Sequence, residues 1–413
     1  MKNVIQNKYA QALNGDQRDP LFEVLKKSHQ YDVAYTSVDK RELIDSTGKK
    51  LLDFTSCNYL SFDQMQDELL EYGTKAAEKY GLHTSRARLM GYHELFPIIE
   101  DKAAKFLGVE ETILFPNTTL AHIGIIPAII KRGDVIFLDK SAHATMYQGS
   151  QMARDKGAVI VSFEQEDMQK LEELLEQHKS SPRKLICVDG VYSMTGDYAL
   201  LTQLVPLAKK YDALLYIDDA HGFGFVGEKP TKDMPYGFKG NGIVNHFAVD
   251  YDNIIYVSGT AKNFGAAAAV VTVTKPMKDF LMAYAKPLDY THPSEPFSLG
   301  ILDRALDLQL EIGEGLREKV FKLTKTLVTG LREEGFTVLN STYFPIVSIL
   351  AGDTERLIKA SQKLYEYGIF LTSCPYPTMP RGKEVLRITI TSNNEEDQID
   401  TLISAFKKIK IYL

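Results

Sequence analysis

The feature that most constrains the fold is an alternation of short apolar runs with helix-like segments between about residues 100 and 275. The runs are mostly β-branched or aliphatic, which is typical of strands buried on both faces of a sheet. Helical patterns such as Asp167–His178 and Leu201–Tyr211 separate them. This alternation predicts an α/β fold with a doubly wound, mostly parallel, seven-stranded sheet. We expect its strands at Thr112–Phe115, Val135–Leu138, Val159–Phe163, Leu185–Val188, Leu214–Ile217, Ile254–Val257 and Ala268–Val273.

The segments on either side of this alternation follow other patterns. Ile44 to Leu52 predicts a hairpin after a polar N-terminal arm, with its turn at Ser46 to Gly48. Apolar residues at spacings of three and four then predict one face of a long helix: Leu316, Val320, Leu323, Leu327 and Leu331. Strands and helices follow in turn, at Thr337–Leu339, Ile346–Leu350, Thr354–Tyr367, Ile369–Thr372, Val385–Thr391 and Asp397–Leu413. We therefore expect an arm and hairpin (1–50), a large domain (51–295) and a smaller C-terminal α+β domain (296–413).

Composition and charge favour an ordinary globular protein. The 413 residues have a formal net charge of −6 and no cluster of Lys and Arg, so nothing indicates a nucleic-acid partner. Apolar stretches such as Ala266–Val273 are much shorter than the roughly 20 residues of a transmembrane helix. Met1 to Lys8 has no apolar core of a signal peptide. We expect a cytoplasmic protein without a membrane span.

Cysteine and histidine do not indicate a metal site. The three cysteines show no metal-binding spacing and fit a reducing compartment: Cys57, Cys187 and Cys374. Three histidines have no carboxylate or cysteine partner at ligand spacing: His83, His93 and His122. The sequence therefore predicts no metal.

Polar groups that follow two neighbouring predicted strands match one kind of chemistry. Lys262 follows the sixth strand, and Asp218 and His221 follow the fifth. A lysine can hold the aldehyde of pyridoxal phosphate (PLP) as a Schiff base. A carboxylate ~4 Å from the pyridine nitrogen, at an effective dielectric near ~20, is worth ~4 kcal/mol and keeps the ring protonated. Alone, Asp218 could cap a turn and His221 could be structural, but the combination with Lys262 favours PLP.

Five segments then resemble, in the same order, motifs of the α-oxoamine synthases. These are PLP-dependent enzymes of fold type I, the aspartate-aminotransferase fold. The resemblance extends over roughly residues 45 to 405. The matching segments are Ser56–Leu60, Asp139–Thr145, Asp189–Asp197, Asp218–Gly222 and Leu386–Thr389.

The resemblance implies a reaction, a cofactor and an assembly. An amino acid would condense with an acyl thioester, carried by coenzyme A or a carrier protein, and lose carbon dioxide to give an α-aminoketone. PLP would bind to Lys262 in the large domain, and Lys262 would move the α-proton as a general base, a role worth ~10²–10⁴-fold. The family also implies a homodimer with shared active sites.

The same resemblance implies the contacts to the PLP ring. His143 would stack on the ring, and Asp218 would pair with the pyridine nitrogen. His221 and Ser193 would lie near the phenolic oxygen.

Phosphate and substrate contacts are implied in the same way. Thr118 and Thr119 would open a helix that binds the phosphate, and free N–H groups at a helix N-terminus do favour an anion. Ser294 or Thr291 would reach the phosphate of the neighbouring chain. The residues implied for the amino-acid substrate are Arg387, which offers a bidentate fork for its carboxylate, Asn58 and Arg86.

The sequence departs from the family pattern at several places. Gly259 replaces a threonine that contacts phosphate, and Ser258 or Thr260 are candidates to replace it. The glycine-rich stretch before Arg86 is altered, Phe96 replaces a histidine, and Gly227 to Asp252 is about a dozen residues longer than expected. These changes leave another PLP reaction, transamination or aldol-type cleavage, as an alternative. A non-catalytic partner subunit is the third.

Overall fold

The computed structural model describes residues 6, 8, 20–30 and 33–413. Two compact units are distinguished in this part of the chain. The larger unit comprises Cys57–Ser193 and Asp197–Lys319. The smaller unit comprises the described part of Met1–Ser56 together with Met194–Gly196 and Val320–Leu413.

This division differs from the predicted boundaries at both ends. Helix α12 (Pro296–Glu311) belongs to the larger unit, because it packs against α3 (Gln66–Tyr80) and α4 (Leu95–Leu107). The N-terminal hairpin belongs with the C-terminal segment, because β3 (Lys50–Asp53) pairs in parallel with β12 (Ile369–Phe370). Neither the packing of α12 against α3 and α4 nor the pairing of β3 with β12 is visible in local sequence patterns.

The larger unit contains the predicted seven-stranded sheet, with the strand order β4-β10-β9-β8-β7-β5-β6. Its neighbours are parallel except at β10, which is antiparallel to both β4 and β9. The predicted fold class and sheet are therefore confirmed. The strands are β4 (Glu111–Phe115), β5 (Val135–Asp139), β6 (Val159–Phe163), β7 (Lys184–Asp189), β8 (Leu214–Asp218), β9 (Ile254–Gly259) and β10 (Ala269–Val273).

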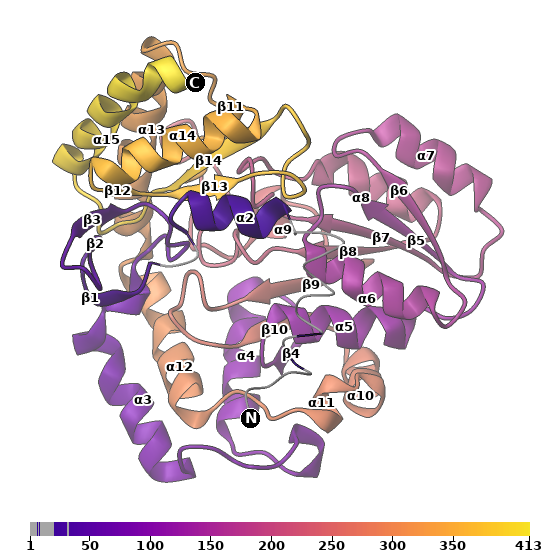
Figure 1. Ribbon diagram of the computed structural model, residues 1–413. Coiled ribbons are helices and arrows are strands. Elements are labelled where there is room, and N and C mark those ends of the chain that lie inside the picture. Colours follow the sequence, from indigo (N-terminus) through magenta and orange to yellow (C-terminus); the bar gives the residue numbers. More distant parts are fainter. Residues whose placement is uncertain (1–5, 7, 9–19, 31–32) are drawn as a thin grey trace. The chain divides into compact units, whose positions relative to one another are not determined.

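Helices cover both faces of this sheet, as the alternating pattern predicts. Figure 1 shows α5 and α6 below β5, β7 and β8, and α7 and α8 above these strands. Besides α3, α4 and α12, the unit contains α5 (Thr118–Ile129), α6 (Ala144–Arg154), α7 (Met168–Gln177), α8 (Leu201–Lys210), α9 (Ile243–His246), α10 (Lys275–Tyr284) and α11 (Pro287–Tyr290). Short 3-10 turns, η1 (Phe62–Gln64) and η2 (Arg88–Met90), complete it.

Helix α5 holds a central place in the core of the larger unit. Its side chains Ala121, Ile125 and Ile126 are fully buried, and they belong to one cluster with Ile136 of β5 and Val257 of β9. Asn117 begins the helix, since its side chain accepts a hydrogen bond from the N–H of Leu120. Because the body of α5 is fixed by packing, its first turn has a fixed position at the edge of the sheet.

The smaller unit is built from two small sheets and the helices packed on them. One sheet has the order β1-β2-β3-β12 and the other β11-β14-β13. The predicted hairpin is confirmed as β2 and β3, but the expected strand Thr337–Leu339 is only a single bridge between Val338 and Ile349. The remaining elements are α2 (Pro20–Lys27), β1 (Tyr35–Asp39), β2 (Glu42–Asp45), the later turns of α13 (Gly313–Glu333), β11 (Ile346–Gly352), α14 (Thr354–Glu366), β13 (Thr372–Cys374), β14 (Glu384–Thr389), α15 (Glu396–Ile409) and η3 (Lys410–Tyr412).

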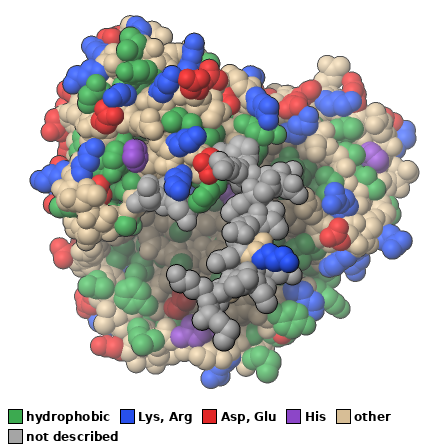
Figure 2. All heavy atoms as spheres, in the orientation of Figure 1, with side chains coloured by type: hydrophobic (Ala, Val, Ile, Leu, Met, Phe, Trp, Pro, Cys, Tyr) green, Lys and Arg blue, Asp and Glu red, His purple; other side chains and the backbone are tan. Residues whose placement is uncertain are grey.

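Charged side chains of both signs are interspersed on one face of the described structure. On the face shown in Figure 2, blue lysines and arginines alternate with red acidic side chains. A search of the described helices finds none that is long and apolar enough to cross a membrane.

We predict that the packing of α12 against α3 does not tolerate a side chain at Gly300. An added Cβ would overlap the carbonyl oxygen of Tyr72 and press on Ala76. Gly300→Ala should therefore destabilise the protein by about 1–3 kcal/mol, as overpacking of a core typically does. Thermal unfolding monitored by circular dichroism would measure this loss.

Gly315→Ala is the matched control for this prediction. Gly315 lies in helix α13, and an added Cβ would meet no atom within 4 Å. This substitution should stabilise the protein by roughly 0.5–1 kcal/mol, because alanine loses less backbone entropy in a helix. Equal melting temperatures for the two variants would show that the close approach at Gly300 has no energetic weight.

Candidate active site

Six strands of the large sheet run in one direction and end at the same edge. β5, β6, β7, β8 and β9 are parallel, and β4 has the same direction because β10 is antiparallel to both β4 and β9. Ligands of doubly wound sheets bind at this edge. The residues at or just beyond these strand ends, in strand order, are Thr118 and Thr119, Lys262, Asp218, Asp189 and His143.

Lys262, His221 and Tyr59 form a hydrogen-bonded chain. The Nζ atom of Lys262 lies 2.6 Å from Nε2 of His221, and Nδ1 of His221 lies 2.5 Å from the hydroxyl oxygen of Tyr59. An ammonium group can only donate, so with Lys262 charged Nε2 accepts and the ring proton lies on Nδ1. Tyr59 and His221 are buried, whereas Lys262 is half-buried. The amine is therefore held in place and can still be reached.

Asp218 is a buried carboxylate that remains ionised. Its Oδ1 accepts the N–H of Ala220 at 3.0 Å, and its Oδ2 lies 2.9 Å from Nε2 of His122. Burial raises the pKa of Asp218, but His122, Lys262 and His143 together lower it further, to about 2. The residue can therefore supply a full negative charge at neutral pH.

Asp189 has the opposite environment. Burial and the charge of Asp218 raise its pKa well above the ordinary value, although one oxygen accepts the N–H of His143 at 2.9 Å. Two neighbouring carboxyl groups whose pKa values are driven apart can take different roles in one site. Asp189 positions the backbone that leads into α6, while Asp218 holds the charge.

His143 presents an exposed ring at the start of α6. Its Nδ1 lies 2.7 Å from the hydroxyl of Thr145 and also receives the N–H of that residue. Partial loss of hydration lowers the pKa of His143; the charge of Asp218 opposes this change, and Lys262 adds to it. A neutral, exposed imidazole is suited to stacking on an electron-poor ring.

The first turn of α5 lies against Gly259. A Cβ added at Gly259 would lie 3.2 Å from Cγ2 of Thr118, so the side chain of Thr118 fills the space that a larger residue at position 259 would need. The two other candidate hydroxyls are fully buried and already donate to backbone oxygens. Ser258 bonds Asp219, and Thr260 bonds the carbonyl oxygens of residues 266 and 268. A hydroxyl has one proton to donate, so the structure does not favour these two as phosphate contacts.

Three other predicted residues lie in the same unit in different settings. Asn58 is buried and accepts the N–H of Phe62, and its amide lies 3.4 Å from the carbonyl oxygen of Ala261, the residue before Lys262. Ser193 is half-buried in the segment after β7. Arg86 is exposed in the loop before η2.

Arg387 belongs to the smaller unit. It lies buried on β14, opposite Ser348 of β11 and Thr372 of β13. Its predicted role with the substrate carboxylate therefore stays a prediction.

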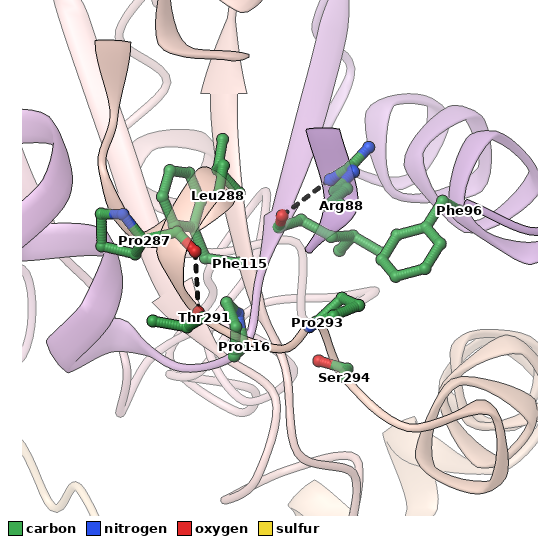
Figure 3. Close-up of a pocket in the computed structure, with 10 residues that line it drawn as sticks. Arg88, Phe96, Phe115, Pro116, Pro287, Leu288, Thr291, Pro293 and Ser294 are labelled. Carbon is green, nitrogen blue, oxygen red and sulfur yellow. Dashed lines mark hydrogen bonds between the residues drawn. The ribbon is translucent and has the colours of Figure 1, made fainter. Parts of the chain in front are cut away.

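Ser294 lines a small cavity beside the segment that leads into α5. Figure 3 shows Ser294 and Pro293 near Pro116, with Phe96 and Arg88 on the other side. The hydroxyl of Ser294 is buried and has no hydrogen-bond partner among the described residues. Phe96, which replaces the family histidine, packs against Arg88, whose Cζ atom lies 4.6 Å from the centre of the phenyl ring. The ring of Phe96 is therefore part of the packed wall of this cavity.

The longer segment from Gly227 to Asp252 folds back on itself and supports Asp219. Glu228 pairs with Phe238 in an antiparallel bridge, and the N–H of Ile243 donates to Oδ2 of Asp219 at 2.9 Å. The hydroxyl of Tyr256 donates to the same oxygen at 2.8 Å. Burial raises the pKa of Asp219 to about 7, in spite of these two hydrogen bonds.

Sequence reasoning missed two contacts of the site. Tyr59 lies inside the segment Ser56–Leu60, so its position was known but its contact with His221 was not. His122 was considered only as a metal ligand. It follows Thr118 by four residues on α5, a spacing that places both side chains on the same face of the helix. The spacing of Thr118 and His122 was therefore the sequence signal that could have placed His122 at the site.

The donor set of this edge fits PLP. A reachable amine, a carboxylate that stays ionised, an exposed imidazole face and a helix N-terminus are what the aldehyde, the pyridine nitrogen, the ring and the phosphate of PLP require. Among the described residues no cluster of His, Cys, Asp and Glu is arranged to hold a metal ion.

Comparisons with known proteins agree with this chemistry. The family model for aminotransferase class I and II matches residues 49–406. The 8-amino-7-oxononanoate synthase of Alkaliphilus oremlandii is 31% identical over 88% of this chain and 88% of its own length, and that of Coprothermobacter proteolyticus is 30% identical over 97% and 96%. The structure of serine palmitoyltransferase from S. paucimobilis with bound PLP and myriocin has a TM-score of 0.85 and 25% identity over 95% of this chain and 97% of that one. These similarities do not favour transamination or aldol-type cleavage.

We predict that Asp219 makes the stability of the protein depend on pH. Its pKa is about 7 in the folded protein and about 3.9 in the unfolded chain. The folded state therefore binds more protons between these values, and the free energy of unfolding falls as the pH rises through about 4 to 7. Asp219→Asn should reduce the difference in melting temperature between pH 5 and pH 8.

Asp233→Asn provides the control, because Asp233 is exposed in the same inserted segment. It should leave the pH dependence unchanged. If Asp219→Asn keeps the full wild-type dependence, the buried carboxyl group does not cause it.

Proposed function

Since the chain belongs to the aminotransferase class I and II family and, within it, to the α-oxoamine synthases, we propose how its own residues carry the reaction. It is a PLP-dependent transferase that condenses an amino acid with an acyl thioester and releases carbon dioxide. The observation that carries the assignment to this site is the hydrogen-bonded amine of Lys262 at the same sheet edge as the ionised Asp218.

The reaction balances without an external oxidant or reductant. A carbon–carbon bond forms between the α-carbon of the amino acid and the acyl carbon, and the carbon–sulfur bond breaks. The bond to the carboxylate then breaks, and carbon dioxide leaves. One proton is removed from the α-carbon and one is returned to it, and the thiolate that leaves takes a proton from solvent, so the products are an α-aminoketone, carbon dioxide and a thiol. Bound PLP supplies a ring that accepts the electrons of these bonds.

We propose that Lys262 binds PLP and moves the α-proton. His221 orients the amine through the 2.6 Å contact with Nζ, and Tyr59 fixes the ring of His221. His143 would cover one face of the cofactor ring, and Asp218 would pair with its nitrogen. Asp218 is anionic at neutral pH, because His122 and Lys262 help to lower its pKa to about 2 although its burial raises it.

For the phosphate we propose Thr118 and Thr119 as the side-chain contacts. They open α5, where backbone N–H groups have no partner within the helix and favour an anion. The methyl group of Thr118 fills the space beside Gly259, and we propose that the hydroxyl of the same side chain takes the part of the threonine that Gly259 replaces.

The substrate contacts and the assembly are also proposals. We infer that Arg387 and Asn58 hold the substrate carboxylate and that Arg86 contributes from its exposed loop. A homodimer in the cytoplasm fits the family, and exposed apolar side chains on the larger unit support a partner surface: Leu82, Met90 and Tyr290. Ser294 remains the proposed contact to the neighbouring chain's phosphate.

The names of the relatives suggest the first substrates to test. In 8-amino-7-oxononanoate the amino group and the ketone are on adjacent carbons. The bond between these two carbons is the one that the condensation forms. On one side of it is a two-carbon fragment with the amino group, which is what remains of alanine after the loss of carbon dioxide. On the other side is a seven-carbon acyl group with a terminal carboxylate. We propose alanine and a heptanedioyl thioester as the first pair, with serine and glycine as alternative amino acids.

The experiment is to incubate the PLP-loaded protein with each amino acid and an acyl-CoA, and to measure thiol and carbon dioxide. We predict equal amounts of both for the correct pair. Lys262→Ala should lower the rate by at least ~10²-fold, as loss of a general base does. Lys275→Ala, which changes an exposed lysine paired with Asp279, serves as the control. Formation of a keto acid without thiol would contradict the proposal.

A second prediction concerns the phosphate contact. Thr118→Val keeps the shape of the side chain but removes the hydroxyl, so the dissociation constant of PLP should rise about 10–100-fold, as expected for a lost hydrogen bond to a charged group. Thr118→Ser should bind PLP nearly as the wild type does. Equilibrium titration followed by absorbance would measure both constants.

The double variant Thr118→Gly/Gly259→Thr is the sharper form of this test. Gly259→Thr alone should weaken PLP binding, because its Cβ would press on Thr118. In the double variant the side chain of residue 118 is absent, so the threonine at position 259 can occupy the space that Thr118 fills in the wild type. Its affinity should exceed that of either single variant; strictly additive losses would refute the exchange.

A further inference from the structure

His122 is a buried link between α5 and two residues of β8. Its Nδ1 lies 2.9 Å from the hydroxyl oxygen of Tyr216, and its Nε2 lies 2.9 Å from Oδ2 of Asp218. Tyr216 and Asp218 are two residues apart on β8, so their side chains point to the same face of the sheet. His122 and Tyr216 are fully buried. Solvent therefore does not compete for these hydrogen bonds.

The hydrogen bonds select one form of the imidazole. The hydroxyl of Tyr216 keeps its proton, because burial raises its pKa well above the ordinary value. In the described structure the hydrogen-bond partner of this hydroxyl is Nδ1 of His122. If the hydroxyl donates to Nδ1, the single ring proton lies on Nε2 and is donated to Asp218. If the imidazole were doubly protonated, Nδ1 would donate instead, and the buried hydroxyl proton would have no acceptor there, which is costly.

The form of His122 decides how much charge remains on Asp218. A neutral imidazole donates a hydrogen bond to the carboxylate and leaves its negative charge for another partner. An imidazolium would balance that charge within the protein. The other titratable groups that act on Asp218 are Lys262, His143 and the neighbouring Asp189.

We propose that Tyr216 holds His122 as a neutral donor to Asp218, and that these two positioning residues thereby determine the protonation of the pyridine nitrogen of bound PLP. This inference rests on the proposed function, because it requires PLP at Lys262 with its nitrogen facing Asp218. It adds two residues that touch neither the substrate nor the reacting atoms. They act through the charge and orientation of one carboxylate.

The first measurement is the nitrogen NMR spectrum of protein labelled with [15N]histidine. His122 should be neutral with its proton on Nε2 between pH 6 and pH 8. An imidazolium, or the tautomer with the proton on Nδ1, would overturn the proposal. This readout needs neither activity nor substrate.

The second measurement uses protein loaded with PLP labelled at the pyridine nitrogen. The wild-type nitrogen should be protonated at pH 8. In Tyr216→Phe the Nδ1 atom is free to take a proton, so His122 becomes charged beside Asp218. A new positive charge within about 4–6 Å should lower the proton affinity of the pyridine nitrogen by roughly 10-fold or more.

The conservative double variant provides the rescue. In Tyr216→Phe/His122→Gln the amide of residue 122 extends to the position of Nε2, so it can donate to Asp218 but cannot become charged. Protonation of the pyridine nitrogen should return towards the wild-type level. A purely structural role of the tyrosine would leave the double variant as impaired as the single one, and that result would refute the proposal.

Tyr256→Phe is the matched control. Tyr256 is also fully buried, but its hydroxyl bonds Asp219 at 2.8 Å rather than His122. It should leave the pyridine nitrogen protonated. Wild-type protein that takes up PLP but gives no aminoketone would contradict the proposed substrates alone. An unchanged nitrogen in Tyr216→Phe would contradict this inference alone.

Discussion

The structure depends on keeping one carboxylate ionised inside the protein. Burial alone would favour the neutral form of Asp218, and the cost of an unpaired buried charge is several kcal/mol (roughly 3–5 when a partner is removed). The N–H of Ala220, the imidazole of His122 and the charge of Lys262 overcome this cost. At the neighbouring Asp189, burial and the charge of Asp218 outweigh the N–H of His143 and the charge of Lys262, so its pKa is raised well above the ordinary value. One edge of the sheet thus contains two carboxyl groups whose pKa values are shifted in opposite directions.

Helix α5 connects this charge to the proposed phosphate site. Its buried apolar body fixes the helix against the sheet, so its first turn and the following turn have fixed positions. The first turn presents Thr118 against Gly259, and the next presents His122 to Asp218. Departures from the family pattern therefore need not mean loss of a function. At Gly259 a side chain from another element fills the space that the missing threonine would need.

Much of the fold and part of the candidate site followed from the sequence. The strands were predictable because each is a short run buried on both faces, and such runs leave a strong local pattern. Lys262 and Asp218 were predictable because parallel strands end at one edge of the sheet, whereas His143 was implied by the resemblance to the family. The choice among Ser258, Thr260 and Thr118 was not predictable. Each has the same hydroxyl group, and only folding shows which protons are already donated to backbone oxygens.

The amino-acid sequence by itself determined the α/β class and the positions of the seven strands along the chain. It also determined the amine of Lys262 and the carboxylate of Asp218. These depend on periodicity and on groups that stand directly beside a strand. The tertiary structure decided the membership of α12 and of the N-terminal hairpin, and the partners of His122. His122 and Asp218 are 96 residues apart, and no local pattern records a hydrogen bond across that separation. Such contacts arise only when helix and sheet pack together.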